Sequence, residues 1–203
     1  HKGMTNIARD GVAVAQEVGY VVELVGDIRE VASGLSAEVS PTFLPKTHPL
    51  ASVNDVMNAV FVESIGIGES MYYGPGAGQK PTATSVTADI IRIARRIKDG
   101  NVGKPFNEFE RETKMADPAD VKSLYYFAIN TPDKKGQLLR LAEIFNAEDI
   151  SFEQVLQQKA NGTRARVVII THAMSQTQLA SVTAKLEAID DFQVLNTLKV
   201  LGE

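Results

Sequence analysis

The residues best suited to contact a ligand closely lie in a glycine-rich turn, Gly74-Pro75-Gly76-Ala77-Gly78. Glycine has no side chain, so its backbone can approach a ligand and can adopt positive φ. A predicted helix follows the turn, and the free N–H groups in the first turn of a helix favour anions. Gly74, Gly76 and Gly78 could therefore bind an anionic group of a cofactor. The simpler alternative, which the glycines alone favour, is a tight turn between a strand and a helix.

A second set of residues could bind a free amino acid. Asn130, Asp133 and Gly136 lie on a loop before a predicted helix, and Ile150 and Ser151 open a later predicted strand. Main-chain N–H groups at the start of the helix could hold a carboxylate, while side-chain oxygens could accept from an ammonium group. The same residues equally fit turn and capping chemistry, with Asp133 stabilising the turn. The sequence leaves both interpretations open.

Other ionisable residues are better explained by structural roles. Lys46 and His48 lie on one proline-bounded loop and could bind a carboxylate or transfer a proton. We favour the simpler interpretation, in which His48 packs against Pro49 or caps a main-chain carbonyl and Lys46 is solvated. Glu63 and Glu69 are expected to be solvated carboxylates beside a hairpin turn. Neither Lys46 nor His48 is predicted to be catalytic, and no cluster of metal ligands is expected.

The first half of the chain must position the glycine-rich turn on strands and one long helix. Ile90, Ile93 and Ile97 fall on one face of that helix, which gives the helix an apolar side. Three residues should break regular structure before the third strand: Pro41, Pro45 and Pro49. The expected elements are strands 20–25, 35–40, 58–65 and 69–73, of which the last two form a hairpin, and a helix over 84–98.

The second half has a clearer rhythm. Apolar residues alternate in four segments and recur at helical spacing in two others, in the order βαββαβ of a ferredoxin-like unit. The dipeptide Asn161-Gly162 favours a two-residue type I′ turn between the second and third strands, because both positions accept positive φ. The expected strands are 124–131, 150–158, 163–171 and 192–200, with helices around 138–145 and 179–189.

Composition excludes several functional classes. The chain has 203 residues, 44% of them hydrophobic and 23% charged, which is ordinary for a globular protein. A net charge of −4 argues against nucleic acid and against an anionic membrane surface as partners. Without cysteine there are no disulfides, thiolate zinc sites or cysteine nucleophiles. We expect a cytoplasmic protein that crosses no membrane, and we interpret His1 as a tag remnant on a piece of a longer chain.

Three segments of the first half resemble homoserine dehydrogenase: VSPTFLPKTHPLASV (39–53), NAVFV (58–62) and YGPGAG (73–78). They occur in the order and at the spacing typical of that family. The loop NTPDKKG (130–136) resembles the turn after the first strand of an ACT domain, which bacterial homoserine dehydrogenases commonly carry here. That turn usually contains Pro-Gly, whereas this chain has Lys135-Gly136.

The resemblance implies an α+β fold: part of the catalytic-domain sheet of homoserine dehydrogenase with its helices, followed by a βαββαβ ACT domain. It implies domain boundaries at 1–98 for the substrate-binding and dimerisation part, 99–120 for a linker and 121–203 for the ACT domain. The family interconverts L-homoserine and L-aspartate 4-semialdehyde with NADP or NAD. The family's Rossmann domain and catalytic lysine motif have no match here, so the chain alone should be inactive.

The resemblance also implies roles for particular residues. Gly78 matches the family's last glycine of the turn, which contacts the cofactor, and this favours a cofactor-binding role for Gly74 and Gly76 as well. The strands over 58–73 correspond to the family's dimerisation region, so a homodimer or higher homo-oligomer is expected. Threonine is the implied amino-acid effector. The alternative is a stand-alone ACT-type regulatory protein, in which the first half is only a scaffold.

Overall fold

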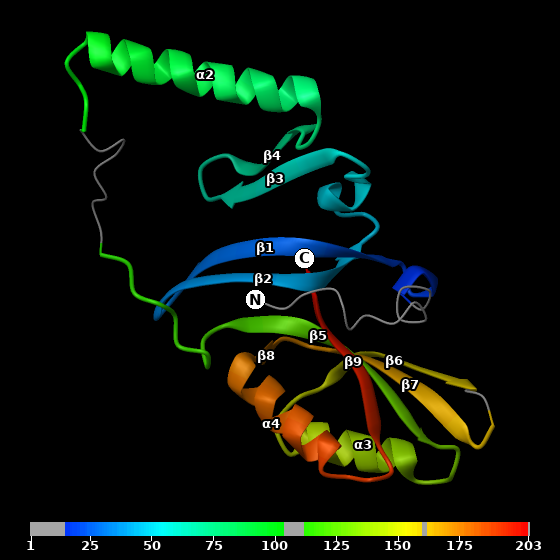
Figure 1. Ribbon diagram of the computed structural model, residues 1–203. Coiled ribbons are helices and arrows are strands. Elements are labelled where there is room, and N and C mark those ends of the chain that lie inside the picture. Colours follow the sequence, from blue (N-terminus) through cyan, green and yellow to red (C-terminus); the bar gives the residue numbers. More distant parts are fainter. Residues whose placement is uncertain (1–14, 104–111, 160–161, 203) are drawn as a thin grey trace. The chain divides into compact units, whose positions relative to one another are not determined.

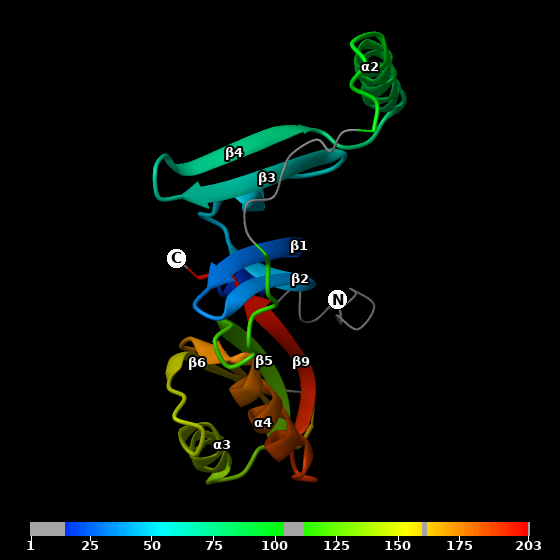
Figure 2. The same cartoon turned by 90° about the vertical axis from the view of Figure 1, so that its left-hand side faces the viewer.

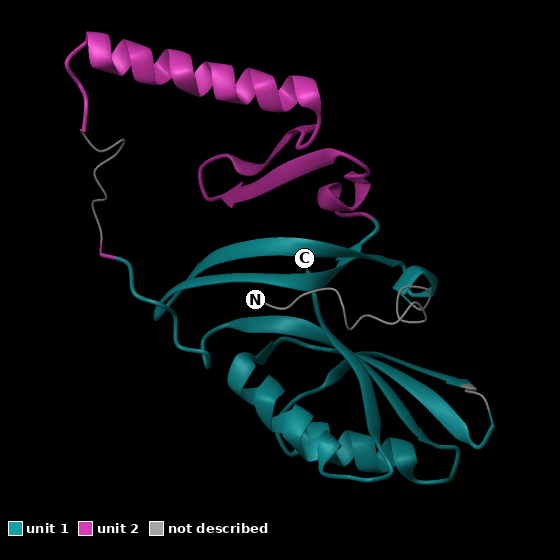
Figure 3. Ribbon diagram, in the orientation of Figure 1, with its two compact units in different colours: residues 1–46, 113–203 teal, residues 47–112 magenta. Residues whose placement is uncertain are grey.

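The chain forms two compact units, shown in Figure 3. The computed structural model describes residues 15–103, 112–159 and 162–202. Unit 1 comprises His1–Lys46 and Thr113–Glu203, and unit 2 comprises Thr47–Glu112. The units do not coincide with the predicted domains 1–98 and 121–203, because the chain leaves unit 1 after Lys46 and returns to it at Thr113. Unit 2 is thus an insertion between two parts of unit 1.

A single mixed sheet organises unit 1 (Figure 1). Its strands follow the spatial order β1-β2-β9-β5-β7-β6, and the short β8 also pairs with β5. Helices α3 and α4 lie on one face of this sheet (Figure 2). The predicted α+β class and the βαββαβ order of the second half are confirmed. The elements are β1 (Tyr20–Val31), β2 (Gly34–Pro45), β5 (Lys122–Pro132), α3 (Gln137–Asn146), β6 (Phe152–Lys159), β7 (Arg164–Thr171), β8 (Met174–Ser175), α4 (Gln176–Glu187) and β9 (Gln193–Val200).

The sheet of unit 1 has a hydrophobic core on each face, because successive side chains of a strand point to opposite sides. Phe127 of β5 packs on the helix side, where its ring centroid lies 5.2 Å from that of Phe145 in α3. Tyr126 packs on the other side, where its ring centroid lies 4.3 Å from that of Phe43 in β2. The hairpin β1–β2 therefore completes the second core. Every buried side chain among the described residues belongs to unit 1.

The hairpin β1–β2 extends the sheet beyond the ferredoxin-like strands. Its residues pair without interruption from Tyr20 with Pro45 to Val31 with Gly34, and β2 runs parallel to β9. The prediction that Pro41 breaks regular structure was wrong, as it was for Pro45, since both lie within β2. Proline fixes φ near about −65°, which an extended strand tolerates, and it removes only one N–H donor.

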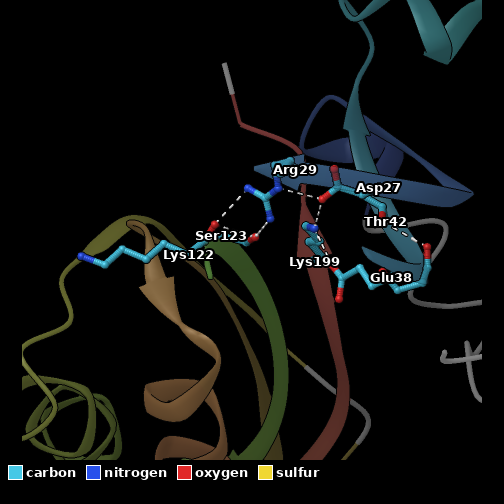
Figure 4. Close-up of polar contacts among 8 residues, drawn as sticks. Asp27, Arg29, Glu38, Thr42, Lys122, Ser123 and Lys199 are labelled. Atoms are coloured by element: carbon cyan, nitrogen blue, oxygen red, sulfur yellow. Dashed lines mark hydrogen bonds and ion pairs between the residues drawn. The ribbon is translucent and has the colours of Figure 1, made fainter. Parts of the chain in front are cut away.

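A polar network joins this hairpin to the rest of unit 1 (Figure 4). The Lys199 ammonium group, on β9, donates to the carboxylates of Asp27 and Glu38, which face each other across the hairpin. Arg29 lies 2.9 Å from Asp27 through Nε and donates through Nη2 to Ser123 Oγ of β5 at 2.9 Å. The side chain of Lys199 is only 5% exposed. Two cations and two carboxylates thus balance around a buried ammonium group, while Arg29 and the two carboxylates stay partly exposed.

The segment that returns from unit 2 is held by the turn of the same hairpin. Leu35 N donates to Lys114 O at 2.8 Å, and Ala116 N donates to Leu35 O at 3.0 Å. Gly34 has φ +149°, and a β-carbon built on it would lie 2.4 Å from Lys114 O. This part of the predicted linker 99–120 is therefore fixed to β2. Residues 104–111 lie outside the described part of the chain.

Unit 2 contains the 3-10 helix η2 (Pro49–Ser52), β3 (Met57–Ser64), β4 (Gly68–Pro75) and α2 (Gln79–Lys98). The predicted antiparallel hairpin is confirmed, with β3 pairing β4 from Met57 with Pro75 to Ser64 with Gly68. Helix α2 begins five residues before its predicted start and has no buried residue. The side chain of Ile90 is 61% exposed and that of Ile97 is 60% exposed. The apolar face of α2 is exposed within the described residues.

The register of β6 and β7 corrects the predicted turn between them. Lys159 pairs with Ala165, whereas a two-residue turn at Asn161-Gly162 would pair Lys159 with Arg164. Gly162 does have positive φ, at +81°, while Asn161 lies outside the described residues. The connection between β6 and β7 is therefore longer than the predicted two-residue turn, because the observed pairing leaves one more residue between the strands.

Candidate functional site

The glycine-rich turn connects β4 to α2 in unit 2. Gly78 is the N-cap of α2, with φ +123°, and no side chain caps the helix there. A residue with a β-carbon rarely adopts this φ, so the conformation requires glycine. The first N–H groups of a helix have no partner within the helix. The turn therefore offers uncapped donors at the start of α2, which suit an anionic group.

The other two glycines of the turn are placed differently. Gly76 N donates to Val56 O at 2.8 Å, and a β-carbon built on Gly76 would lie 1.9 Å from Nδ2 of Asn58. Gly74 lies within β4, opposite Asn58, and a β-carbon built there would meet no atom within 4 Å. The structure thus gives a conformational reason for Gly78 and a packing reason for Gly76. Nothing in the surroundings of Gly74 demands a glycine.

A second candidate site is an open pocket of about 390 Å³ in unit 1. It is lined by the loop from Thr131 to Leu138 together with Gln157 of β6 and Val167 of β7. Gly136 is the N-cap of α3 in a left-handed conformation, with φ +88°, and no side chain caps this helix either. The pocket therefore combines uncapped helix N–H donors with the carboxylate of Asp133 and two lysine side chains of the loop.

The predicted effector residues do not all gather at this pocket. Asp133 and Gly136 line it, and Asp133 N donates to Thr163 O at 2.9 Å. Asn130 lies outside the lining, where its main-chain oxygen accepts from Arg164 Nη2 at 3.2 Å. Ile150 and Ser151 are also outside the lining. Ile150 belongs to the helix-side core, and Ser151 O accepts from His172 N at 3.0 Å.

Gln157 and Val167 are lining residues that the sequence did not predict. They face each other across the β6–β7 ladder, on the side of the sheet that carries α3. The alternating pattern of each strand indicated which residues share a face, but not how the two strands are aligned. Since register decides which residue of β6 lies beside the loop, no local signal could have identified this pair.

Lys46 and His48 have structural contacts. Lys46 Nζ donates to Gln16 O at 2.9 Å, so it is bonded as well as exposed. His48 Nδ1 accepts from Leu50 N at 3.2 Å, which makes His48 the N-cap of η2. Its ring centroid lies 4.8 Å from that of Phe61. His48 therefore accepts from a main-chain N–H, whereas the sequence suggested that it caps a main-chain carbonyl. The contacts of Lys46 and His48 support a structural role for both residues.

Ionisable groups with displaced pKa values lie away from both candidate sites. Burial raises the pKa of Tyr125 and that of Tyr126 to about 12. Hydrogen bonds from Lys185 and Ser181 lower the pKa of Glu148. These groups belong to the core and the helix layer of unit 1, so they supply neither site with an acid or a base. Within the described ranges, no group of three or more histidine, aspartate or glutamate side chains could hold a metal ion, and no helix is long and apolar enough to span a membrane.

Comparison with known proteins gives consistent matches. A family model described as homoserine dehydrogenase matches residues 1–91. The chain is 61% identical over 201 residues to the homoserine dehydrogenase of Lactococcus lactis subsp. lactis, covering 99% of this chain and 47% of that protein. It is 32% identical over 200 residues to that of Bacillus subtilis, covering 98% of this chain and 46% of that protein.

A solved structure extends the similarity to the fold. The crystal structure of a homoserine dehydrogenase from Thiobacillus denitrificans superposes with a TM-score of 0.87 and 27% sequence identity, covering 98% of this chain and 47% of that one. The chain therefore spans about half the length of the curated relatives and of the solved structure that it matches. Both candidate sites fall within the matched regions.

Proposed function

Because the chain belongs to the homoserine dehydrogenase family, we propose that it forms the C-terminal part of an enzyme that interconverts L-homoserine and L-aspartate 4-semialdehyde. The observation that carries this proposal is the match along 99% of the chain to a homoserine dehydrogenase at 61% identity. The matched share of that relative is under half, so the whole enzyme's activity is an inference for this chain. The similarity of the first half to the enzyme family favours this proposal over a stand-alone regulatory protein.

The glycine-rich turn is the proposed contact with the NAD or NADP cofactor. The cofactor, when bound, supplies or accepts the hydride of the reaction. The turn fits the anionic part of such a cofactor. Gly78 has the positive φ that favours glycine, and no side chain caps the first N–H groups of α2. We propose that Gly78, with Gly74 and Gly76 beside it, binds the cofactor through main-chain atoms. These residues bind and orient, and none of them can exchange a proton with the substrate.

The chain alone should not oxidise L-homoserine. The sequence has no match to the family's Rossmann domain or to its catalytic lysine motif, so the groups that react in the family are not expected in this chain. Formation of NADH or NADPH should stay at the rate without protein when homoserine is supplied with either cofactor, measured by absorbance against an intact homoserine dehydrogenase. Measurable oxidation by this chain would show that the reacting groups lie within it.

We propose a regulatory role for residues 121–203, as an ACT domain that binds an amino acid, with threonine as the effector. The pocket beside α3 supports this role, since its volume of about 390 Å³ suits a small ligand. The uncapped N–H groups after Gly136 can hold the carboxylate of the amino acid, and Asp133 can accept from its ammonium group. A contribution from Asn130, Ile150 and Ser151, which lie outside the pocket lining, stays a prediction.

Threonine should bind this chain, and Gly136→Ala should weaken binding about tenfold. The substituted residue would disfavour the left-handed conformation by about 1–2 kcal/mol and so displace the N–H groups that hold the carboxylate. Isothermal calorimetry measures both affinities. Gly100→Ala is the matched control, because Gly100 also has positive φ and open space around its β-carbon position but lies in unit 2. An absence of heat with millimolar threonine, isoleucine and methionine would end the effector proposal and leave family membership unaffected.

We further propose that the chain acts within a homo-oligomer. The hairpin β3–β4 and helix α2 contain no buried side chain within the described residues, although both carry large apolar ones. Val60 is 60% exposed and Tyr72 is 71% exposed. Apolar surface of this extent favours burial against another protein surface. A second copy of the chain and the remaining half of the enzyme are the proposed partners of unit 2.

A further inference from the structure

The side chain of Asn58 lies against the backbone of Gly76. A β-carbon built on Gly76 would lie 1.9 Å from Nδ2, 2.2 Å from Cγ and 2.8 Å from Oδ1 of Asn58. Carbon atoms do not approach other heavy atoms this closely without a bond. Any residue other than glycine at position 76 would therefore displace the Asn58 amide or the turn itself.

This contact fixes a short connection at its first residue. Only residues 76–78 separate the end of β4 at Pro75 from the start of α2 at Gln79. Gly76 is held on one side by its hydrogen bond to Val56 O and on the other by the Asn58 amide. No side chain of the described part of unit 2 is buried, so the direction of the turn depends on these local contacts and not on a surrounding core.

We propose that Asn58 is a positioning residue for the cofactor-facing turn. Its amide fills the space above Gly76 and sets the path of the chain to Gly78, where the uncapped N–H groups of α2 begin. The inference rests on the proposed cofactor contact of this turn. It also assigns a reason for Gly76: this residue is glycine because of Asn58, and not because the ligand itself needs the space.

The two reasons for a glycine at position 76 predict opposite outcomes in a double substitution. Gly76→Ala alone should raise the KM for the nicotinamide cofactor about tenfold in the intact enzyme, with kcat at saturating cofactor little changed. Asn58→Ala removes the three atoms that the new β-carbon would meet and should raise the KM only about threefold. The double variant should return to the KM of Asn58→Ala, because alanine then fits at position 76.

Hydrogen exchange reports on the structure of the turn independently of its effect on cofactor binding. Hydrogen exchange of the amides at position 76 and at Thr82, which donate to Val56 O and Gly78 O in this chain, should be faster in Gly76→Ala and should return to the Asn58→Ala level in the double variant. Gly66→Ala is the control for both measurements, since Gly66 lies in the β3–β4 turn with no atom within 4 Å of its β-carbon position. It should leave both quantities unchanged.

A double variant with a KM as high as that of Gly76→Ala would overturn the proposal, because the ligand and not Asn58 would then exclude the β-carbon. The proposal would also be overturned if the double variant restored the hydrogen-exchange rates while Gly76→Ala, Asn58→Ala and the double variant all kept the KM of the unsubstituted enzyme. That result would remove the cofactor contact of the turn, on which the inference rests, and leave Asn58 with a structural role only.

Discussion

Replacing Lys199 with methionine should lower the free energy of unfolding of unit 1 by about 3–5 kcal/mol. The ammonium group donates to Asp27 and Glu38, and the lysine side chain is 5% exposed. Methionine would preserve much of the side-chain volume but leave two carboxylates facing each other across the hairpin with only Arg29 nearby. Breaking a buried ion pair by removing one partner is costly because the remaining charge has little water to solvate it. Chemical denaturation followed by circular dichroism measures the loss.

Lys185→Met is the matched control for this substitution. Lys185 also forms an ion pair, with Glu148, but its side chain is 43% exposed. Exposed pairs contribute about 0–1 kcal/mol, so this variant should lose little stability. Adding Asp27→Asn and Glu38→Gln to Lys199→Met should restore part of the loss, since the unpaired charges are then removed. Equal losses in the two lysine variants would show that the network around Lys199 is as well solvated as a surface pair.

The Lys199 network illustrates what the sequence could not predict. Lys199 reaches Asp27 across 172 residues and Glu38 across 161, and no local pattern links such positions. By contrast, the βαββαβ order was predictable because each of its elements has its own hydrophobic period. The extension of the sheet by β1–β2 was missed because Pro41 and Pro45 were interpreted as breaks. A proline at an edge or beside a short ladder is compatible with a strand, and its neighbours decide whether the strand continues.

The candidate sites were predictable to the extent that residue type alone specifies backbone conformation. Gly78 and Gly136 were expected to matter, and both adopt positive φ directly before a helix. The packing of Gly76 against Asn58 was not predictable, because it depends on how β3 pairs with β4. The same limit applies to Gln157, which lines the pocket through the register of β6 and β7. Local conformation follows from the sequence here, while contacts between strands require the fold.

Unit 1 should remain folded after unit 2 has been removed. Every buried side chain of the described chain belongs to unit 1, so residues 15–46 joined to 113–203 keep both hydrophobic cores and the Lys199 network. The joined ends lie at opposite ends of the β1–β2 hairpin, since Lys46 N bonds Gly19 O and Lys114 O accepts from Leu35 N. Eleven residues of strand separate these ends by roughly 36 Å. A linker of about 30 glycine and serine residues has a mean end-to-end length of roughly 30 Å and can span the gap.

The midpoint of thermal unfolding of this shortened protein should lie close to that of unit 1 in the full chain. A fragment of residues 121–203, which follows the domain boundary predicted from the sequence, should be less stable by about 4 kcal/mol or more. It lacks Phe43, whose ring lies 4.3 Å from that of Tyr126, and it leaves the β9 edge unpaired. Circular dichroism melts of the two proteins, at equal concentration, test this difference. Equal stability would mean that the β1–β2 hairpin is an appendage and that residues 121–203 form an independent domain. The expected difference would show that the hairpin belongs to the same fold as residues 121–203, and its last residues lead directly into the segment that carries the glycine-rich turn.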